Sequence, residues 1–159
     1  MHETGHGLMI THQSGGLLMA TYGPACVAVW SQKPTRTLFD IQRGQLAAEA
    51  LRRPGRQLFL CVVSAKADPP EQDVRNASAA MITDLGPKLA SCACVIEGTG
   101  FRAAITRTVL TGISLMIRAP MPLAFFEGVP QACTWFEART RGGEIRGLPE
   151  ALVSARQSP

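Results

Sequence analysis

Short apolar runs that alternate with longer stretches of helical spacing constrain the fold of this chain more than any other feature. The strand candidates are almost continuously apolar: QLFLCVV (57–63), SCACVI (91–96) and LAFF (123–126). Such runs are typical of strands buried on both faces of a sheet. The helix candidates carry apolar residues three or four positions apart: residues 34–53, 69–89, 101–118 and 129–138. Strands alternating with helices predict an α/β fold with right-handed crossovers.

Two further strands precede the first helix. LLMATY (17–22) and ACVAVW (25–30) flank a Gly-Pro turn, which predicts a β-hairpin. The expected order is therefore ββαβαβαβα, in a mixed and mostly parallel sheet led by the hairpin. The domain is expected over residues 17–138.

Both ends of the chain lack a clear helical period. Residues 1–16 are rich in Gly, His and Thr, so we expect a flexible N-terminal arm with at most a short edge strand at 8–10. Residues 139–159 are rich in Gly and Arg, which predicts a partly disordered C-terminal tail. A short helix around 149–155 is the one element expected there.

Composition narrows the class of protein. The chain has 159 residues, 46% of them hydrophobic, which indicates one globular domain. Its net charge of +4 comes from scattered arginines, and aromatics make up only 6%, so nucleic-acid binding is not expected. The five cysteines are odd in number and mostly inside apolar runs. They favour a reducing, cytoplasmic location. No signal peptide is evident, and no apolar run approaches the roughly 20 residues of a membrane span.

The order of elements and several local stretches resemble the STAS domain (sulfate transporter and anti-sigma-factor antagonist). The stretches are ACVAVW, PGRQLFLCVVS, the Pro-Pro pair before the second helix, VIEGTGFRAAITRTVLTGI and PLAFFEGVPQACTWF. The chain is most similar to small stand-alone bacterial proteins grouped with STAS and lipid-binding Sec-fourteen-like domains. The likeness covers about residues 17–138.

This resemblance implies a non-catalytic binding or regulatory module. STAS domains bind protein partners, and some bind nucleotides or lipids. In anti-sigma-factor antagonists a phosphorylated Ser opens the helix after the third strand, within an Asp-Ser-Ser-Gly stretch. The corresponding stretch here is SAKADPP (64–70). Ser64 is only a loose counterpart of that Ser, so the resemblance does not carry kinase regulation over to this chain.

The first twelve residues, MHETGHGLMITH, contain the zinc-peptidase pattern H-E-x-x-H. In such sites two His one helical turn apart bind zinc and the Glu activates a water molecule. Glycines inside and after the pattern disfavour that helix, since each costs about 1 kcal/mol in a helix interior. Met9 also occupies the position of the metzincin turn glycine. The binding module that we expect needs no metal or cofactor. A zinc peptidase is the alternative function. Its site would consist of His2, Glu3, His6 and His12.

Ligands of open parallel sheets lie beyond the carboxyl ends of the strands. The candidate ligand-binding residues are the polar residues and glycines expected there: Ser64, Lys66, Glu97, Gly98, Thr99, Gly100, Arg102 and Glu127. The stretch EGTGFR (97–102) joins a strand to a helix, whose first N–H groups can hold an anion. The alternative is a tight connection with Thr99 as the helix N-cap.

Glu97 and Glu127 each end a strand, and two neighbouring carboxylates can perform acid/base catalysis. Solvated loop groups or helix caps are the alternative. All three His lie in the first twelve residues, so no Ser–His or Cys–His nucleophile is expected.

The helix over 101–118 is apolar on more than one side. It is either a buried central helix or a surface for a protein partner, a lipid or a second copy of the chain.

Overall fold

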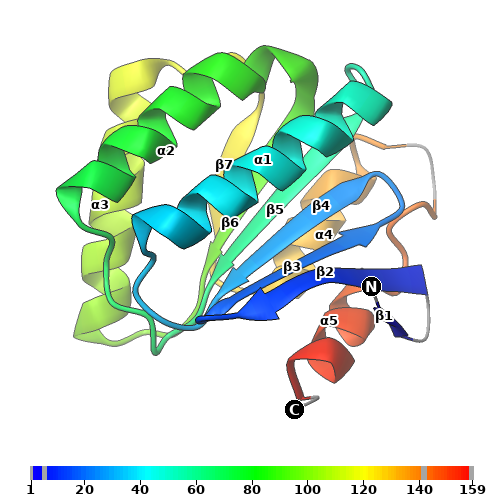
Figure 1. Ribbon diagram of the computed structural model, residues 1–159, viewed down its shortest axis with the longest axis horizontal. Helices are drawn as coiled ribbons and strands as arrows, with labels where there is room; N and C mark the ends of the chain where they lie inside the picture. The colour runs from blue at the N-terminus through cyan, green and yellow to red at the C-terminus, as the bar shows by residue number, and fades with distance from the viewer. Residues whose placement is uncertain (1, 5–6, 141–142, 158–159) are drawn as a thin grey trace.

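The computed structural model describes residues 2–4, 7–140 and 143–157, and in this part of the chain seven strands form one sheet with helices on both faces (Figure 1). The strands lie in the sheet in chain order: β1 (His2–Thr4), β2 (Leu8–Ser14), β3 (Leu17–Tyr22), β4 (Ala25–Trp30), β5 (Gln57–Val63), β6 (Leu89–Ile96) and β7 (Leu123–Phe126). The helices are α1 (Arg36–Arg52), α2 (Gln72–Leu85), α3 (Phe101–Ile117), α4 (Val129–Glu137) and α5 (Leu148–Gln157), with a 3₁₀ turn, η2 (Gly86–Lys88), after α2.

The α/β prediction with a mixed sheet is confirmed, and the hairpin of β3 and β4 lies at its predicted residues. The expectation of a mostly parallel sheet is wrong. β1 to β4 pair antiparallel and β4 to β7 pair parallel, so the two kinds of pairing are equally frequent among the described strands. The difference arises because β1 and β2 extend the hairpin on its outer side. The observed order is therefore the predicted series preceded by two strands and followed by α5.

The flexible arm predicted over residues 1–16 is instead largely part of the sheet. β2 pairs with β3, and the Gly15-Gly16 turn between them adopts positive φ angles of 62° and 86°, which glycine reaches without strain. Leu8 and Ile10 alternate with more exposed neighbours and are buried. Their burial fixes the register of β2, because a slip of one residue would turn both to the other face.

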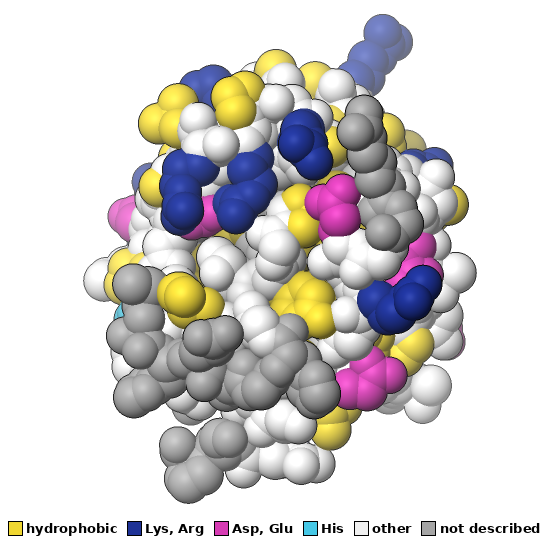
Figure 2. Space-filling model, turned by 90° about the vertical axis from the view of Figure 1, so that its right-hand side faces the viewer, with side chains coloured by type: hydrophobic (Ala, Val, Ile, Leu, Met, Phe, Trp, Pro, Cys, Tyr) yellow, Lys and Arg dark blue, Asp and Glu magenta, His cyan; other side chains and the backbone are white. Residues whose placement is uncertain are grey.

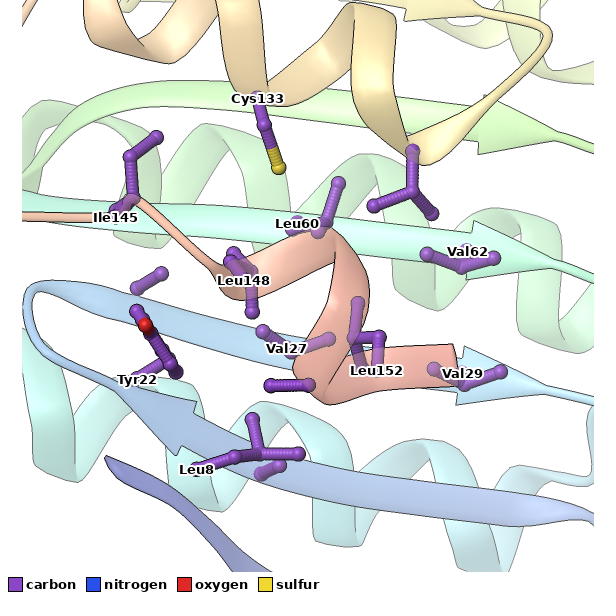
Figure 3. Packing of buried hydrophobic residues seen from close by; sticks show 14 of the residues in the cluster. Leu8, Tyr22, Val27, Val29, Leu60, Val62, Cys133, Ile145, Leu148 and Leu152 are labelled. Carbon is purple, nitrogen blue, oxygen red and sulfur yellow. The ribbon is translucent and has the colours of Figure 1, made fainter. Parts of the chain in front are cut away.

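The short helix expected around 149–155 is confirmed as α5, which is longer than expected and lies against β1 and β2, so this part of the tail predicted to be partly disordered is helical. Figure 3 shows Leu148 and Leu152 of α5 among the sheet side chains Val27, Val29 and Leu8. Both leucines are almost completely buried. α5 and the N-terminal strands therefore pack against each other. Neither segment alone could indicate this contact.

Two helices begin later than predicted. Thr35 is the N-cap of α1, and its side chain accepts a hydrogen bond from the Leu38 N–H at 3.3 Å. α2, expected from residue 69, begins at Gln72 with Glu71 as its N-cap. The Pro69-Pro70 pair explains the delay, because a residue before proline is disfavoured in the helical region.

The helices divide into two layers. The three helices that connect parallel strands, α1, α2 and α3, cover one face of the sheet, and α4 and α5 cover the other (Figure 1). Right-handed crossovers between strands in sequential order require this one-sided arrangement. We call the two sides the crossover face and the terminal face.

The surface carries mixed charge. On the face seen in Figure 2, Lys and Arg side chains lie beside Asp and Glu side chains. None of the helices within the described ranges is both long and apolar enough to cross a membrane.

Candidate ligand-binding site

An apolar cavity of about 100 Å³ lies on the crossover face, between the sheet and its three helices. Its floor is formed by side chains of β5 and β6, among them Phe59, Cys61, Cys92 and Cys94. Its walls come from α1, α2 and α3. An apolar cavity of about 150 Å³ in another protein stays dry and admits benzene, so this space suits a small apolar group.

The cavity exists because small side chains lie among rings that cannot collapse onto them. Cys61 and Cys94 are direct partners in the parallel register of β5 and β6, and both point to the crossover face. Phe59, Phe125 and Trp30 surround these small thiols. Rigid rings leave space beside a small residue that flexible aliphatic chains would fill.

The polar side chains of the walls have partners inside the protein. Trp30 Nε1 donates to Gln42 Oε1 at 2.7 Å, and Gln42 Nε2 contacts Met81 Sδ at 3.7 Å. Ser78 Oγ donates to the Val74 carbonyl at 2.9 Å. Because these groups are already hydrogen-bonded, they offer little to a polar ligand, and the cavity selects apolar groups.

Ser114 Oγ, also on the cavity wall, donates to the Thr111 carbonyl at 2.8 Å, within α3 itself. This back-bond turns the hydroxyl toward its own helix, so the cavity sees mainly carbon from this side.

Two of the cavity thiols, Cys92 and Cys94, are protonated at neutral pH. Burial raises the pKa of Cys92 far above its ordinary value of 9.0. A hydrogen bond to Cys61, together with burial, raises the pKa of Cys94 well above the same value. A protonated thiol is a poor nucleophile and behaves as a small apolar group. The floor of the cavity is therefore uncharged.

The cavity extends to the carboxyl edge of the sheet. Pro34 lies in the loop after β4, and Asp68 and Pro70 lie in the loop after β5; all three line the cavity. Asp68 is exposed. The edge at which the sequence predicted a ligand site is therefore the mouth of the cavity.

The structure separates the eight residues predicted for that edge. Ser64 lies in a turn, where its Oγ accepts a hydrogen bond from the Lys66 N–H at 3.3 Å. Neither residue lines the cavity, although their neighbours Val63 and Asp68 do. Lys66 is exposed.

Glu97 is held by an arginine from α5. Arg156 Nη1 and Nη2 donate to its two carboxylate oxygens at 2.9 and 2.7 Å, a two-pronged ion pair. Glu127 instead lines a different hollow, together with Arg107 and Gln131. Glu97 is not among the residues of that hollow, so the structure does not unite the two carboxylates in one site.

The glycine stretch after β6 is a tight connection. Gly98 has a φ of 91°, and a Cβ there would lie 2.7 Å from the Ala65 Cβ. Gly100 is the N-cap of α3 and has no side-chain capping bond, so the predicted cap role of Thr99 is wrong. Thr99 is exposed. The side chain of Arg102 lies outside the described part of the structure.

The zinc-peptidase pattern lacks the local structure that it needs. His2, Glu3 and Thr4 form β1, an extended strand paired with β2. Extended residues do not bring positions i and i+4 to one helical face. His6 lies outside the described residues. His12 lies on β2, with its Nε2 3.1 Å from Ser14 Oγ.

Sequence reasoning missed the cavity residues. The same-face spacing of Cys92 and Cys94 is visible in the sequence, but the placement of Cys61 beside Cys94 depends on strand register. Comparison with protein-family models, curated proteins and solved structures returns no match.

Proposed function

We propose that the protein is a non-catalytic binding module of STAS-like type that holds a small apolar ligand, or the apolar end of a larger one, in the cavity of the crossover face. The cavity itself is the observation that carries this proposal. Its uncharged floor and internally bonded polar groups support an apolar ligand. The predicted element series within residues 17–137 supports the STAS-like assignment.

Two features support a role without catalysis. The cavity thiols Cys92 and Cys94 have raised pKa values, so they do not supply a thiolate at neutral pH. Glu97 is neutralised by Arg156, which removes one member of the carboxylate pair considered for acid/base chemistry. Binding is the activity that remains consistent with these groups.

α3 links the cavity to the surface. Leu110 and Ile113 line the cavity, whereas Leu115 is 77% exposed and Ile105 is 36% exposed. A ligand that fills the cavity would press on one side of this helix and change the surface on the other. A protein partner that contacts exposed α3 residues would thus sense occupancy.

Benzene is a suitable probe, with benzoate as its charged analogue. We expect benzene to shift the methyl resonances of Met81 and Ile113 and to raise the melting temperature, because it binds the folded state only. Benzoate should do neither. The matched variant Cys94→Leu fills the cavity floor and should abolish both effects. The proposal would be refuted if benzene had the same effects on Cys94→Leu as on the unmodified protein, or if it had no effect on the unmodified protein.

A further inference from the structure

A second hollow, of about 420 Å³, lies outside the carboxyl ends of β6 and β7. The chain leaves β6 toward α3 on the crossover face, and it leaves β7 toward α4 on the terminal face. Neighbouring parallel strands whose connections diverge to opposite faces open a crevice between the two loops. Open α/β sheets place ligands in such crevices. We call this hollow the β6–β7 crevice.

Arg107 of α3 forms one wall of the β6–β7 crevice. Its Nη2 donates to the Ile96 carbonyl at 3.0 Å and to the Gly98 carbonyl at 2.6 Å. These bonds fix the guanidinium in place without neutralising its charge. Within the ranges that the structure describes, no carboxylate forms an ion pair with Arg107.

Glu127 lies on the opposite side, between the end of β7 and the start of α4. Among the described residues it has no ion-pair partner. The crevice thus holds a fixed cation and a carboxylate that do not pair with each other. Each retains its charge for a ligand.

Apolar side chains complete the crevice. Phe125 and Phe126 come from β7, and Ile96 ends β6. Phe126 also packs against Trp135 of α4, with ring centroids 5.7 Å apart, which holds that ring in place. Gln131 adds one amide group at the rim, and its Oε1 would lie 2.5 Å from a Cβ placed on Gly128.

We propose that the β6–β7 crevice binds a small zwitterion with an apolar body, of the class of α-amino acids with aliphatic side chains. The ligand carboxylate pairs with Arg107, its ammonium group pairs with Glu127, and its side chain lies on the phenylalanine rings. A ligand with only one charge would form one of the two charge-assisted pairs and lose the other. Simple anions and simple amines are therefore weaker ligands.

L-leucine tests the proposal, with L-leucinamide, which lacks the carboxylate, and 4-methylpentanoate, which lacks the amine. Titration of the ¹⁵N-labelled protein should shift the amide signals of Phe126, Glu127 and Gln131 with L-leucine. Both analogues should bind about tenfold more weakly or worse, since each loses one charge-assisted pair. If 4-methylpentanoate bound as tightly as L-leucine, the proposal of a zwitterionic ligand would be wrong and the crevice would be a simple anion site. No shifts with L-leucine would overturn the site itself.

Substitutions can show whether the charge of a residue, and not its part in the fold, is needed to bind L-leucine. Glu127→Gln keeps the size of an exposed side chain and should lower the affinity for L-leucine about tenfold. Glu150→Gln, exposed on α5, is the matched control and should change nothing. Unchanged affinity in Glu127→Gln would contradict the proposal. Arg107→Lys retains the positive charge on which the fold of the loop could depend. This variant should bind L-leucine more weakly than the unmodified protein, because lysine lacks the fixed fork of the guanidinium group.

The two sites share only Phe125 among their described lining residues, so variants of other lining residues should affect them separately. Cys94→Leu, which fills the apolar cavity, should leave the L-leucine affinity unchanged, and Glu127→Gln should leave the benzene response unchanged. If Cys94→Leu abolished L-leucine binding, the separate β6–β7 site would be wrong.

Discussion

The two faces of the sheet are built from alternate residues of the same strands, yet the apolar cavity of about 100 Å³ lies on one of them. On the terminal face, Val27, Leu60 and Val62 pack with Leu148 and Leu152 of α5 (Figure 3) and with residues of α4, among them the fully buried Phe136. On the crossover face, thiols alternate with aromatic rings, and the cavity remains. Rings are present on both faces, so the cavity follows from how the thiols lie among Phe59, Phe125 and Trp30 and not from the presence of rings alone.

The pleat of the strands separates the cavity from the opposite layer residue by residue. Cys61 and Cys94 face the cavity, and their neighbours Val62 and Val95 face the packed side. The terminal face can stabilise the fold while the crossover face leaves room for a ligand.

The largest expected effect is on the terminal face. Leu152→Ala should lower the free energy of unfolding by about 2–5 kcal/mol, since it opens a cavity in a packed layer. Leu110→Ala, on the cavity wall, should cost less than about 2 kcal/mol, because its side chain already borders empty space. Urea unfolding of both variants measures the difference. Similar losses in the two would remove the distinction between the faces.

Enlarging one cysteine on each face sharpens the comparison. Cys133→Leu adds carbon to a buried position in α4 and should cost about 1–3 kcal/mol through overpacking. Cys94→Leu adds the same atoms where the cavity can accept them, and the free energy of unfolding should stay within about 1 kcal/mol. Thermal or urea unfolding decides, and a larger loss in Cys94→Leu than in Cys133→Leu would show that the cavity cannot take the added group.

The smallest effect is a pH dependence that both faces share. Burial raises the pKa of Cys26, on the crossover face, and of Cys133, on the terminal face, from 9.0 to about 12. The folded protein keeps these protons while the unfolded chain releases them. The resulting stability is complete below pH 9 and is lost as pH rises toward 12. The loss is up to about 1.4 kcal/mol per pH unit for each thiol.

Urea unfolding at pH 7 and pH 10 checks this dependence. Cys26→Ala and Cys133→Ala should each reduce the loss between the two pH values by about 1.4 kcal/mol relative to the unmodified protein. Comparing each variant with itself at the two pH values removes the cost of the substitution. A loss unchanged by either substitution would show that these thiols do not ionise on unfolding in this range.

Local composition predicted the parts of the fold that local forces determine. β3, β4 and β5 lie at the predicted residues because each is a short apolar run between clear breaks. Only a short strand at 8–10 was expected where β2 runs from Leu8 to Ser14, because Leu8 and Ile10 are its buried residues and polar residues follow them. Their burial comes from α5 at the other end of the chain, and no local pattern shows such a partner.

The candidate site divides in the same way. The carboxyl edge, where topology led the sequence to predict a ligand, supplies Pro34, Asp68 and Pro70 to the cavity, whose floor lies on side chains from within β5 and β6. The pairing of Glu97 with Arg156 joins the loop after β6 to α5, and the meeting of Cys61 with Cys94 depends on register. Such contacts arise only when distant segments pack, so spacing in the sequence could not identify them.

The position of α5 also has a consequence for synthesis of the protein. Every strand is translated before the helix that lies against β1 and β2. A nascent chain that has already assembled its sheet would expose Leu8, Val27 and other aliphatic residues of the terminal face until α5 is made. During that interval the bare face is a target for chaperones and for aggregation, and the speed with which the last segment is translated sets how long the exposure lasts.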